Sequence, residues 1–384
     1  MRVLCVTGIK SDYDILYPVL SELKKSNHEI IVVASGAHLS DQHNNTYQRI
    51  IEDGFKINDK VDTLLSTDRN VQRSKGTGLL IQGLTQTVER TNPDFLLVVG
   101  DREESIATAI VGNYMEKLIV HIGGGDPVYG NADDPMRFAV SKLAHIHCCT
   151  AKPYMKNLQK IGEEDFRIFY TGNPAFANID FVSMIKKPDL MNQLGITSEN
   201  YIVMIKHPLS SEVESSRRQV EITLKSLEKF CAKHNYQVIC IPPNSDPGSY
   251  EMKNVVKNYS DKNWLMISDT LPRSQFINLM RHARVLVGNS SMGILEAPHY
   301  KLPVVNIGNR QQGRLNAGNV KFVSYNKNEI IKAVEKASLD NKYRLKIKKL
   351  KNPYGDSSAP QKVIKAIESV DINDRKWYIK EKVC

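Results

Sequence analysis

The sequence predicts an α/β protein built from two doubly wound domains, and three observations lead to that prediction. Short, nearly continuous apolar runs alternate with amphipathic helical patterns along the chain, as in parallel sheets covered by helices on both faces. The alternation restarts after Gly172-Asn-Pro174, and Lys186-Lys-Pro188 has the composition of a connector. A length of 384 residues also suits two domains. We therefore expect domains at 1–172 and 173–360.

Each predicted element follows from its local pattern. In the first half the apolar runs predict strands at 2–7, 30–34, 95–99, 118–122, 146–149 and 168–170. Helical periodicity marks the segments 14–25, 71–91, 103–115 and 134–143 between them. In the second half strands are predicted at 201–205, 238–241, 265–267, 285–287 and 304–307, again with intervening helices. A loop at 352–360 precedes a last helix, predicted from about 361 to 384.

Composition narrows the class of protein. The chain is 41% hydrophobic and 24% charged, and no apolar run approaches the roughly 18 residues of a membrane helix. Its first eight residues are too short and too rich in β-branched side chains for a signal peptide. The six cysteines lack zinc or redox spacing, so we expect reduced packing residues in a cytoplasmic protein.

The formal charge of +10 suits an anionic substrate. Much of the excess positive charge comes from lysines in 332–351 and 362–382, on helix faces that we expect to be solvated. No nucleic-acid recognition motif accompanies the charge, so we expect neither a nucleic-acid nor a membrane partner.

The segment 285–298 is the most informative stretch of the chain. An apolar strand runs into Gly-Asn-Ser290-Ser291-Met-Gly, and a helix is predicted directly after it. Backbone N–H groups and two hydroxyls there can bind an anion, and Glu296 is placed to accept hydrogen bonds from ribose hydroxyls. The next strand ends in a glycine-containing loop with Arg310, whose guanidinium matches phosphate oxygens. We therefore expect a nucleotide diphosphate or sugar nucleotide. A serine N-cap is the structural alternative.

Two strand ends of the first half place charged side chains at one sheet edge. Lys10 follows the first strand, either as a substrate contact or as a solvent lysine with Asp12 capping a helix. Asp101 and Arg102 follow the strand at 95–99. A carboxylate held against a cation stays ionised, so Asp101 can serve as a base or orient a sugar. The alternative for Asp101 is a helix N-cap.

The next strand ends in His121-Ile-Gly-Gly-Gly-Asp126, where three glycines let the backbone approach a ligand closely. Asp133, Asp134 and Arg137 come shortly afterwards. Neighbouring carboxylates repel, so one of them can retain a proton and act as an acid. We expect either Asp133 or Asp134 to cap the helix that contains Arg137.

Further candidates follow strands of the second half. His207 comes after the strand at 201–205 beside Lys206, and its imidazole can protonate a departing phosphate oxygen. Asn244 is available to a sugar, and Phe276 can stack on a base. The structural alternatives are a strand-end histidine without a catalytic role and core packing for Phe276. The run His145-Ile-His147-Cys-Cys fits no zinc site, because neighbours on a strand point to opposite faces.

Several of these motifs together carry a family resemblance. They are Gly100-Asp-Arg102, His121-Ile-Gly-Gly-Gly-Asp126, Ser141-Lys-Leu-Ala-His-Ile-His147, Lys206-His-Pro208, Gly288-Asn-Ser-Ser291 and Arg310-Gln-Gln-Gly-Arg314. In this order, and over nearly the whole chain, the set resembles the hydrolysing UDP-N-acetylglucosamine 2-epimerases of sialic and other nonulosonic acid pathways.

The resemblance implies a GT-B fold, with the substrate in a central cleft between two Rossmann-like domains and the C-terminal helix returning to the first. It implies elimination of UDP to give a 2-acetamidoglucal, to which water adds, with no metal or nicotinamide cofactor. It suggests Ser290, Ser291 and Arg310 at the diphosphate and Glu296 at the ribose. It also suggests that Asp101, Asp133 and His207 act at the sugar. The supporting polar contacts that it implies are Arg102, Arg137 and Asn244. A homodimer is the assembly it suggests.

The chain departs from that family pattern at three places. Lys10 stands where most relatives have arginine, and Gly123 stands where many have a glutamate that is a candidate acid or base. The loop from Asp126 to Asp133 is one residue longer than in sialic-acid-type members. Asp126 or Asp133 is therefore expected to take over the role of that glutamate, or the substrate differs.

We therefore expect an enzyme that converts UDP-N-acetylglucosamine to N-acetylmannosamine and UDP. One alternative is the same reaction on UDP- or GDP-N,N'-diacetylbacillosamine. Two others are a GT-B glycosyltransferase and a catalytically weak protein that binds sugar nucleotides.

Overall fold

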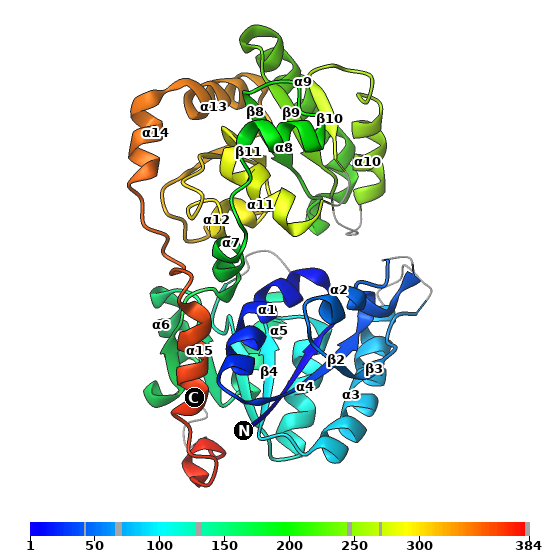
Figure 1. The fold of residues 1–384 in the computed structure, drawn as a ribbon, viewed down its shortest axis with the longest axis vertical. Coiled ribbons are helices and arrows are strands. Elements are labelled where there is room, and N and C mark those ends of the chain that lie inside the picture. The colour runs from blue at the N-terminus through cyan, green and yellow to red at the C-terminus, as the bar shows by residue number, and fades with distance from the viewer. Residues whose placement is uncertain (42–43, 66–70, 128–132, 244–247, 269–270, 381–384) are drawn as a thin grey trace. The chain divides into compact units, whose positions relative to one another are not determined.

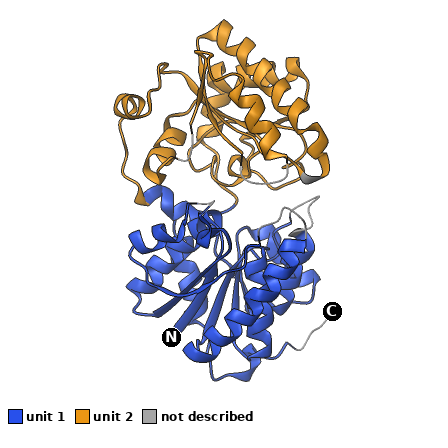
Figure 2. Ribbon diagram, turned by 90° about the vertical axis from the view of Figure 1, so that its right-hand side faces the viewer, with its two compact units in different colours: residues 1–128, 132–180, 354–384 blue, residues 129–131, 181–353 orange. Residues whose placement is uncertain are grey.

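The computed structural model describes residues 1–41, 44–65, 71–127, 133–243, 248–268 and 271–380 (Figure 1). The chain forms two compact units, coloured separately in Figure 2. Unit 1 comprises residues 1–128, 132–180 and 354–384, and unit 2 comprises residues 129–131 and 181–353. Each unit is an α/β layer structure, which confirms the predicted fold class.

The described part of unit 1 contains a parallel sheet of seven strands in the order β3-β2-β1-β4-β5-β6-β7. Its strands are β1 (Arg2–Thr7), β2 (Glu29–Ser35), β3 (Ile57–Val61), β4 (Phe95–Val99), β5 (Leu118–Ile122), β6 (Ile146–Cys149) and β7 (Ile168–Tyr170). Its helices are α1 (Lys10–Lys25), α2 (Tyr47–Glu52), α3 (Val71–Thr91), α4 (Glu103–Tyr114), α5 (Asp133–Leu143), α6 (Lys152–Lys160) and α15 (Ala359–Glu368). The short α7 (Ala177–Phe181) follows at its end.

Helices cover both faces of this sheet, because its strands are apolar on both sides (Figure 2). Alternate residues of β1 point to opposite faces, so Val3 and Cys5 join one core cluster while Leu4 and Val6 join the other. The first cluster is completed by α1 and α15, which lie side by side (Figure 1). The second is completed by α3, α4 and α5.

Unit 2 repeats this plan with six parallel strands, within the described residues, in the order β10-β9-β8-β11-β12-β13. They are β8 (Tyr201–Ile205), β9 (Gln237–Ile241), β10 (Leu265–Ile267), β11 (Val285–Gly288), β12 (Val304–Ile307) and β13 (Val320–Val323). Its helices are α8 (Lys187–Leu194), α9 (Ser216–His234), α10 (Ser249–Lys257), α11 (Arg273–His282), α12 (Met292–Leu295), α13 (Lys327–Leu339) and α14 (Asn341–Lys348). Helices α9, α10 and α13 cover one face of the sheet, and α8 and α11 cover the other.

The structure differs from the sequence-based expectations mainly at sheet edges and helix ends. Strands β3 and β13 were not predicted. Both are edge strands and partly exposed, and β3 is also mostly polar. The last helix was predicted to run to 384, but α15 ends at Glu368. Beyond it, Asp371 accepts a hydrogen bond from the backbone N–H of Asn373, and Asp374 accepts one from that of Lys376. Such aspartate turns compete with helix, which explains the early end.

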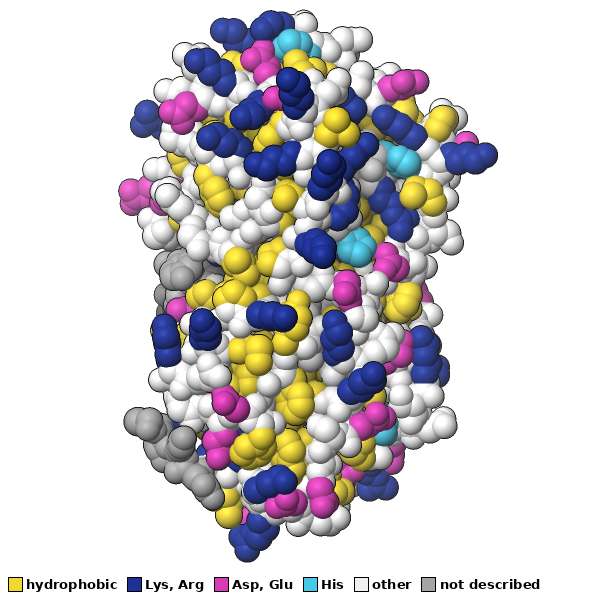
Figure 3. Space-filling model, turned by 90° about the vertical axis from the view of Figure 1, so that its left-hand side faces the viewer, with side chains coloured by type: hydrophobic (Ala, Val, Ile, Leu, Met, Phe, Trp, Pro, Cys, Tyr) yellow, Lys and Arg dark blue, Asp and Glu magenta, His cyan; other side chains and the backbone are white. Residues whose placement is uncertain are grey.

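The surface agrees with the expected solvated lysine faces over 332–351 but not at Lys380, whose side chain is 17% exposed and pairs with Glu163. Lysines of α13, α14 and the segment after them are exposed, and basic side chains are frequent over unit 2 on the side shown in Figure 3. None of the helices in the described part of the chain combines the length and apolar character that crossing a membrane requires. Five cysteines are buried and free, as expected for packing residues. Cys384 lies outside the described residues.

Candidate active site

In unit 1 the direction in which successive strands are added to the sheet reverses between β1 and β4. Ligands of doubly wound sheets bind at the carboxyl ends of the strands beside such a point. The chain leaves β1 through Gly8 into α1, and leaves β4 through Gly100 into α4. Lys10 is the first residue of α1, and the N-cap residue before it is Ile9. The structure therefore brings Lys10, Asp101 and Arg102 to this edge of the sheet, as the sequence predicted.

Asp101 is held by an arginine from another helix. Nε of Arg137 donates a hydrogen bond to Oδ2 of Asp101 at 2.9 Å, and Nη2 of Arg137 contacts the same oxygen. The N-cap position of α4 is occupied by Arg102, which excludes the N-cap alternative for Asp101. The expected pairing of Asp101 with Arg102 is wrong, because Arg102 lies 3.7 Å from both Glu103 and Glu104.

Arg137 also approaches a second carboxylate. Its Nη1 lies 3.9 Å from Oδ2 of Asp126, whose side chain is 8% exposed. Although burial alone lowers the pKa of Arg137, Asp101 and Asp126 raise it above its usual value. The guanidinium therefore stays charged and holds the two carboxylates close together.

The loop before Asp126 depends on its glycines. Gly123 adopts a φ of +81°, which favours glycine. A Cβ at this position would lie 3.8 Å from Oδ2 of Asp126, so that carboxylate lies close to where a side chain of residue 123 would begin. Thr150 donates a hydrogen bond of 2.5 Å to the same oxygen. Asp126 is thereby placed beside residue 123, where the family resemblance leads us to expect a glutamate.

His121 supports the loop as a neutral imidazole. Burial lowers its pKa to about 3, with His147 lowering it further. One ring nitrogen lies 2.8 Å from the carbonyl oxygen of Gly100, and the other lies 3.2 Å from the hydroxyl of Ser141. Because the carbonyl can only accept, Nε2 carries the proton. His121 therefore links the turn after β4 to the end of β5.

Two acidic residues near this site were not among the predicted site residues. Burial raises the pKa of Asp12 to about 8, which Arg102 opposes and Glu104 reinforces. Glu104 is 7% exposed, and burial likewise raises its pKa. Asp12 is not a helix cap, since α1 begins at Lys10. The clustering of acids at two strand ends was the signal in the sequence that could have identified both residues.

Asp133 is the first residue of α5, and its side chain lies outside the described residues. Asn244 also lies outside them. Whether either residue contributes to the site therefore remains a prediction.

In unit 2 the strand order reverses between β8 and β11, and Asn289 joins the two strand ends. Its Oδ1 accepts a hydrogen bond from the backbone N–H of His207 at 2.7 Å, and its Nδ2 donates one to the carbonyl of His207 at 2.8 Å. Its own carbonyl accepts hydrogen bonds from Arg310 at 3.1 Å and from Gln311 at 3.2 Å. Asn289 thus positions both His207 and the arginine loop, a role that the sequence analysis missed.

The helix predicted after Ser291 is shorter than expected. Helix α12 has four residues and ends before Glu296, which occupies its C-cap position. Ser291 occupies the N-cap position of α12 but makes no side-chain capping hydrogen bond, while the backbone N–H of Met292 points at Oγ of Ser290, 3.4 Å away. A single turn carries only a small dipole, which weakens the predicted contribution of the helix to anion binding. Ser290, Ser291 and Glu296 nevertheless follow the central strand β11 at one strand end.

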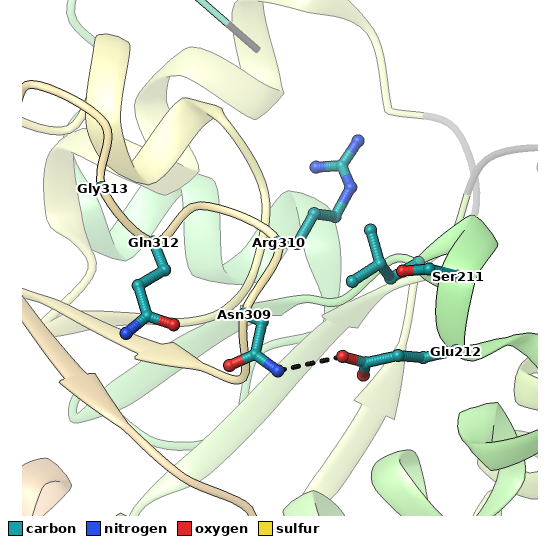
Figure 4. A pocket seen from close by; sticks show the side chains of 7 residues that line it. Ser211, Glu212, Asn309, Arg310, Gln312 and Gly313 are labelled. Carbon is teal, nitrogen blue, oxygen red and sulfur yellow. Dashed lines mark hydrogen bonds between the residues drawn. The ribbon is translucent and has the colours of Figure 1, made fainter. Parts of the chain in front are cut away.

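A pocket of about 500 Å³ opens beside the arginine loop (Figure 4). It is lined by Leu209, Ser211, Glu212, Asn309, Arg310, Gln312 and Gly313. Nδ2 of Asn309 donates a hydrogen bond to Glu212 at 2.9 Å, while Arg310 extends in a different direction from Asn309 and Gln312.

The model of the UDP-N-acetylglucosamine 2-epimerase family matches residues 21–368, which span both units. The chain belongs to the UDP-N-acetylglucosamine 2-epimerase family. It is an epimerase-family protein, as the motifs at its strand ends predicted.

Two curated relatives of this epimerase resemble it over most of its length. A GDP/UDP-N,N'-diacetylbacillosamine 2-epimerase (hydrolyzing) from Campylobacter jejuni is 30% identical over 339 residues, with 87% of each chain covered. A UDP-N,N'-diacetylbacillosamine 2-epimerase (hydrolyzing) from Legionella pneumophila is 30% identical over 379 residues, with 97% of each covered. A solved structure of MnaA from S. aureus with UDP superposes with a TM-score of 0.80 at 19% identity, covering 96% of each chain. That structure supports a GT-B-like fold for the epimerase.

One lysine near the arginine loop, Lys206, is buried. Nζ of Lys206 lies 3.2 Å from the hydroxyl of Tyr325, which donates a hydrogen bond to Gln219. Burial lowers the pKa of Lys206 to about 7, with Glu212 opposing and Arg310 reinforcing the shift. The family motif therefore contains a lysine that readily changes its charge near neutral pH.

Phe276 packs against the apolar cluster between the sheet and α11, as the structural alternative predicted. The histidines that resembled a metal cluster also have structural partners. Nδ1 of His145 faces the backbone N–H of Ile119 at 3.1 Å, and Nε2 of His147 lies 2.8 Å from Glu163.

Proposed function

We propose that this chain is a hydrolysing 2-epimerase that releases UDP from a nucleotide-linked 2-acetamido sugar and inverts C2. The observation that carries the proposal is the group formed by Asp101, Arg137 and Asp126 at the switch point of unit 1. Two carboxylates that share one buried guanidinium can remove a proton from carbon and return one. Its membership of the epimerase family supports this reaction class.

The reaction has two balanced steps. In the first, Asp101 removes the proton from C2, the C1–oxygen bond to the diphosphate breaks, and UDP departs with the bonding electrons, leaving a 2-acetamidoglucal. In the second, protonated Asp126 donates a proton to C2 on the opposite face, and the electrons of the C1–C2 double bond form the new C2–H bond. Water then bonds to C1 and gives its proton to the Asp126 carboxylate, while Asp101 releases the proton that it took in the first step to solvent. His207, Arg310, Ser290 and Ser291 stabilise the charge that develops on the diphosphate.

Asp126 supplies the second carboxylate in this proposal. Many relatives use a glutamate at the position of Gly123, and here Asp126 Oδ2 lies 3.8 Å from where its Cβ would be. Asp133, at the start of α5, remains the other candidate for this role. Lys10, Arg102 and Asn244 are proposed to support the sugar, Glu296 to bind the ribose, and Phe276 to contact the base.

The sugar we favour is N,N'-diacetylbacillosamine linked to a nucleoside diphosphate. The two relatives at 30% identity carry that substrate in their names. We give this similarity more weight than the motif resemblance, which favoured UDP-N-acetylglucosamine. UDP-N-acetylglucosamine is the second candidate, because the family model is named for it.

Proton NMR in deuterated water tests the reaction and the sugar together. The protein is incubated in parallel with UDP-N,N'-diacetylbacillosamine and with UDP-N-acetylglucosamine. Free C2-inverted sugar with deuterium at C2, appearing together with UDP, is the expected result. A deuterated, inverted UDP-sugar without release would indicate a non-hydrolysing epimerase. UDP release that rises strongly with an added sugar acceptor would indicate a glycosyltransferase, and an unchanged spectrum would indicate a binding protein.

Asp101→Asn tests the assignment of the base. The amide keeps the shape of the side chain but cannot accept a proton, so we expect UDP release to fall by about 10²- to 10⁴-fold. Affinity for UDP, measured by calorimetry, is expected to stay within about twofold, because the proposed nucleotide contacts belong to unit 2. Asp189→Asn, an exposed aspartate of α8, is the matched control and is expected to leave both values unchanged. Near-full activity of Asp101→Asn would refute the role.

A further inference from the structure

A buried group of charges connects the C-terminal segment of the chain to the rest of unit 1. Nζ of Lys380 lies 2.7 Å from Oε2 of Glu163, and Nε2 of His147 lies 2.8 Å from the same oxygen. Lys142 reaches the other oxygen at 3.3 Å. The side chains of Glu163 and His147 are fully buried. Such a group is costly to bury unless each charge has a partner, so Lys380 and Glu163 depend on one another.

These contacts fix the protonation of His147. Although burial raises the pKa of Glu163, His147 and Lys380 together lower it to about 2, so Glu163 is a carboxylate. Burial lowers the pKa of His147, so its ring is neutral at neutral pH. A carboxylate can only accept, so the single ring proton is on Nε2 and Nδ1 carries the lone pair. Nδ1 is buried and has no hydrogen-bond partner among the described residues.

That lone pair faces the glycine loop of the candidate active site. A Cβ on Gly124 would lie 3.5 Å from Nδ1 of His147, 3.0 Å from Nδ1 of His121 and 3.3 Å from Oγ of Ser141. These three polar side chains therefore lie on the side of Gly124 where a Cβ would project, and they leave little room for one. Asp126 follows two residues later, so the position of its carboxylate depends on the position of Gly124.

The C-terminal segment is held firmly enough to place Lys380. Arg167 is fully buried, and its guanidinium donates hydrogen bonds of 2.7 Å to the carbonyls of Trp377 and Ile379. It also contacts the carbonyl of Lys376. Trp377 itself is 5% exposed. Nζ of Lys380 makes a further hydrogen bond of 2.7 Å to the carbonyl of Lys142.

We propose that Lys380 is a positioning residue for the reaction. Its ammonium holds Glu163 ionised, Glu163 holds His147 with its proton on Nε2, and His147 supports Gly124 of the loop that carries Asp126. The part of this inference that concerns activity rests on the proposed function. The connection between Lys380 and the loop is a structural claim that can be tested without turnover.

The pH dependence of this group gives a readout that a simple structural role would not produce. Among the described residues, the charged and titratable groups facing Lys380 include Glu163, Lys142, Arg167, His147 and His145. Burial lowers the pKa of Lys380 to about 8, against the opposing effect of Glu163. Above this pH Lys380 loses its charge, so Glu163 keeps Lys142 at one oxygen but loses the cation at the oxygen that contacts His147, and kcat is expected to fall.

Three variants test the proposal by kcat, KM and pH profile. Lys380→Met is expected to lower kcat about ten- to a hundredfold, the size of effect that a displacement of about 1 Å produces. The KM for the sugar nucleotide is expected to change less than threefold. Lys380→Arg keeps the charge at all pH values, so it is expected to retain kcat and to lose the decline above pH 8. Lys376→Met, an exposed lysine of the same segment, is the matched control and is expected to behave as wild type.

Hydrogen exchange measured by mass spectrometry tests the structural claim separately. In Lys380→Met, peptides covering 118–126 are expected to exchange faster, while peptides of unit 2 exchange as in wild type. Wild-type kcat in Lys380→Met, or unchanged exchange in 118–126, would overturn the proposal. If wild-type protein turns over no sugar nucleotide, the proposed function fails, and the exchange data still decide whether Lys380 supports the loop.

Discussion

At the scale of single residues, the partners of ionisable side chains determine their chemistry. Asp101 precedes Arg102 in the sequence, yet its cation is Arg137, 36 residues later. The start of α4 turns Arg102 towards Glu103 and Glu104, while α5 brings Arg137 to the same strand end. The residue types of the candidate site were thus predictable from the sequence, but their pairing was not, because it depends on which helix ends lie together.

Asp12→Asn tests the unusual pKa of Asp12. The folded-state pKa of about 8 lies above the unfolded value of 3.8, so between these pH values the folded chain holds a proton that the unfolded chain has lost. The contribution of Asp12 to the free energy of unfolding therefore falls as the pH rises from about 4 to 8. Asparagine cannot ionise, so the Asp12→Asn variant does not undergo this fall in stability.

We expect the melting temperature of Asp12→Asn to match that of wild type at pH 4.5 and to exceed it by about 2–4 °C at pH 8.5. The expected gain is modest because Asp12 is only half-buried. Differential scanning fluorimetry at both pH values measures it. An equal difference at both pH values would contradict the elevated pKa.

At the scale of elements, apolar periodicity predicted the interior strands well, whereas it missed two partly exposed edge strands, β3 and β13. Runs such as 95–99 and 201–205 form strands β4 and β8 with the predicted bounds, because both faces of each strand are buried. Helix α3 also has its predicted bounds despite Gly76, Gly78 and Gly83. Its glycines have different roles, which only the packing of α3 against its neighbours reveals.

Gly76→Ala and Gly78→Ala form a matched pair within α3. A Cβ at Gly78 meets nothing within 4 Å, so alanine is expected to stabilise the helix by about 0.5–1 kcal/mol. A Cβ at Gly76 would lie 2.6 Å from the backbone carbonyl of Thr63, so alanine there is expected to destabilise by about 1–3 kcal/mol. Urea unfolding measures both values. Two variants shifted in the same direction would contradict this description of the helix.

At the scale of the whole molecule, the two units have separate cores and different proposed tasks. Apolar clusters fill both faces of each sheet, and each unit carries one of the two tryptophans of the chain. Trp377 belongs to the core of unit 1, and Trp264 packs against that of unit 2. The proposed proton-transfer residues Asp101 and Asp126 lie in unit 1, whereas the proposed nucleotide contacts lie in unit 2.

Single-tryptophan variants can therefore follow each unit separately. Trp377→Phe leaves Trp264 as the reporter of unit 2, and Trp264→Phe leaves Trp377 as the reporter of unit 1. UDP at 100 times its Kd stabilises the state that binds it by about 2.7 kcal/mol. We expect the urea midpoint reported by Trp264 to rise by about 1 M. Arg310→Ala is expected to reduce this rise, and a UDP effect reported by Trp377 alone would contradict the assignment of nucleotide binding to unit 2.

The sequence by itself determined the α/β class, the interior strands and the strand ends at which charged and glycine-rich segments gather. These features follow from patterns with a period of two or of about 3.6 residues and from the residues that end them. Only the tertiary structure decided which groups meet: Asp101 with Arg137, His207 with Asn289, and Glu163 with Lys380, 217 residues apart. The physical reason is that ion pairs and pKa values depend on burial and on distances in space, which local periodicity does not contain.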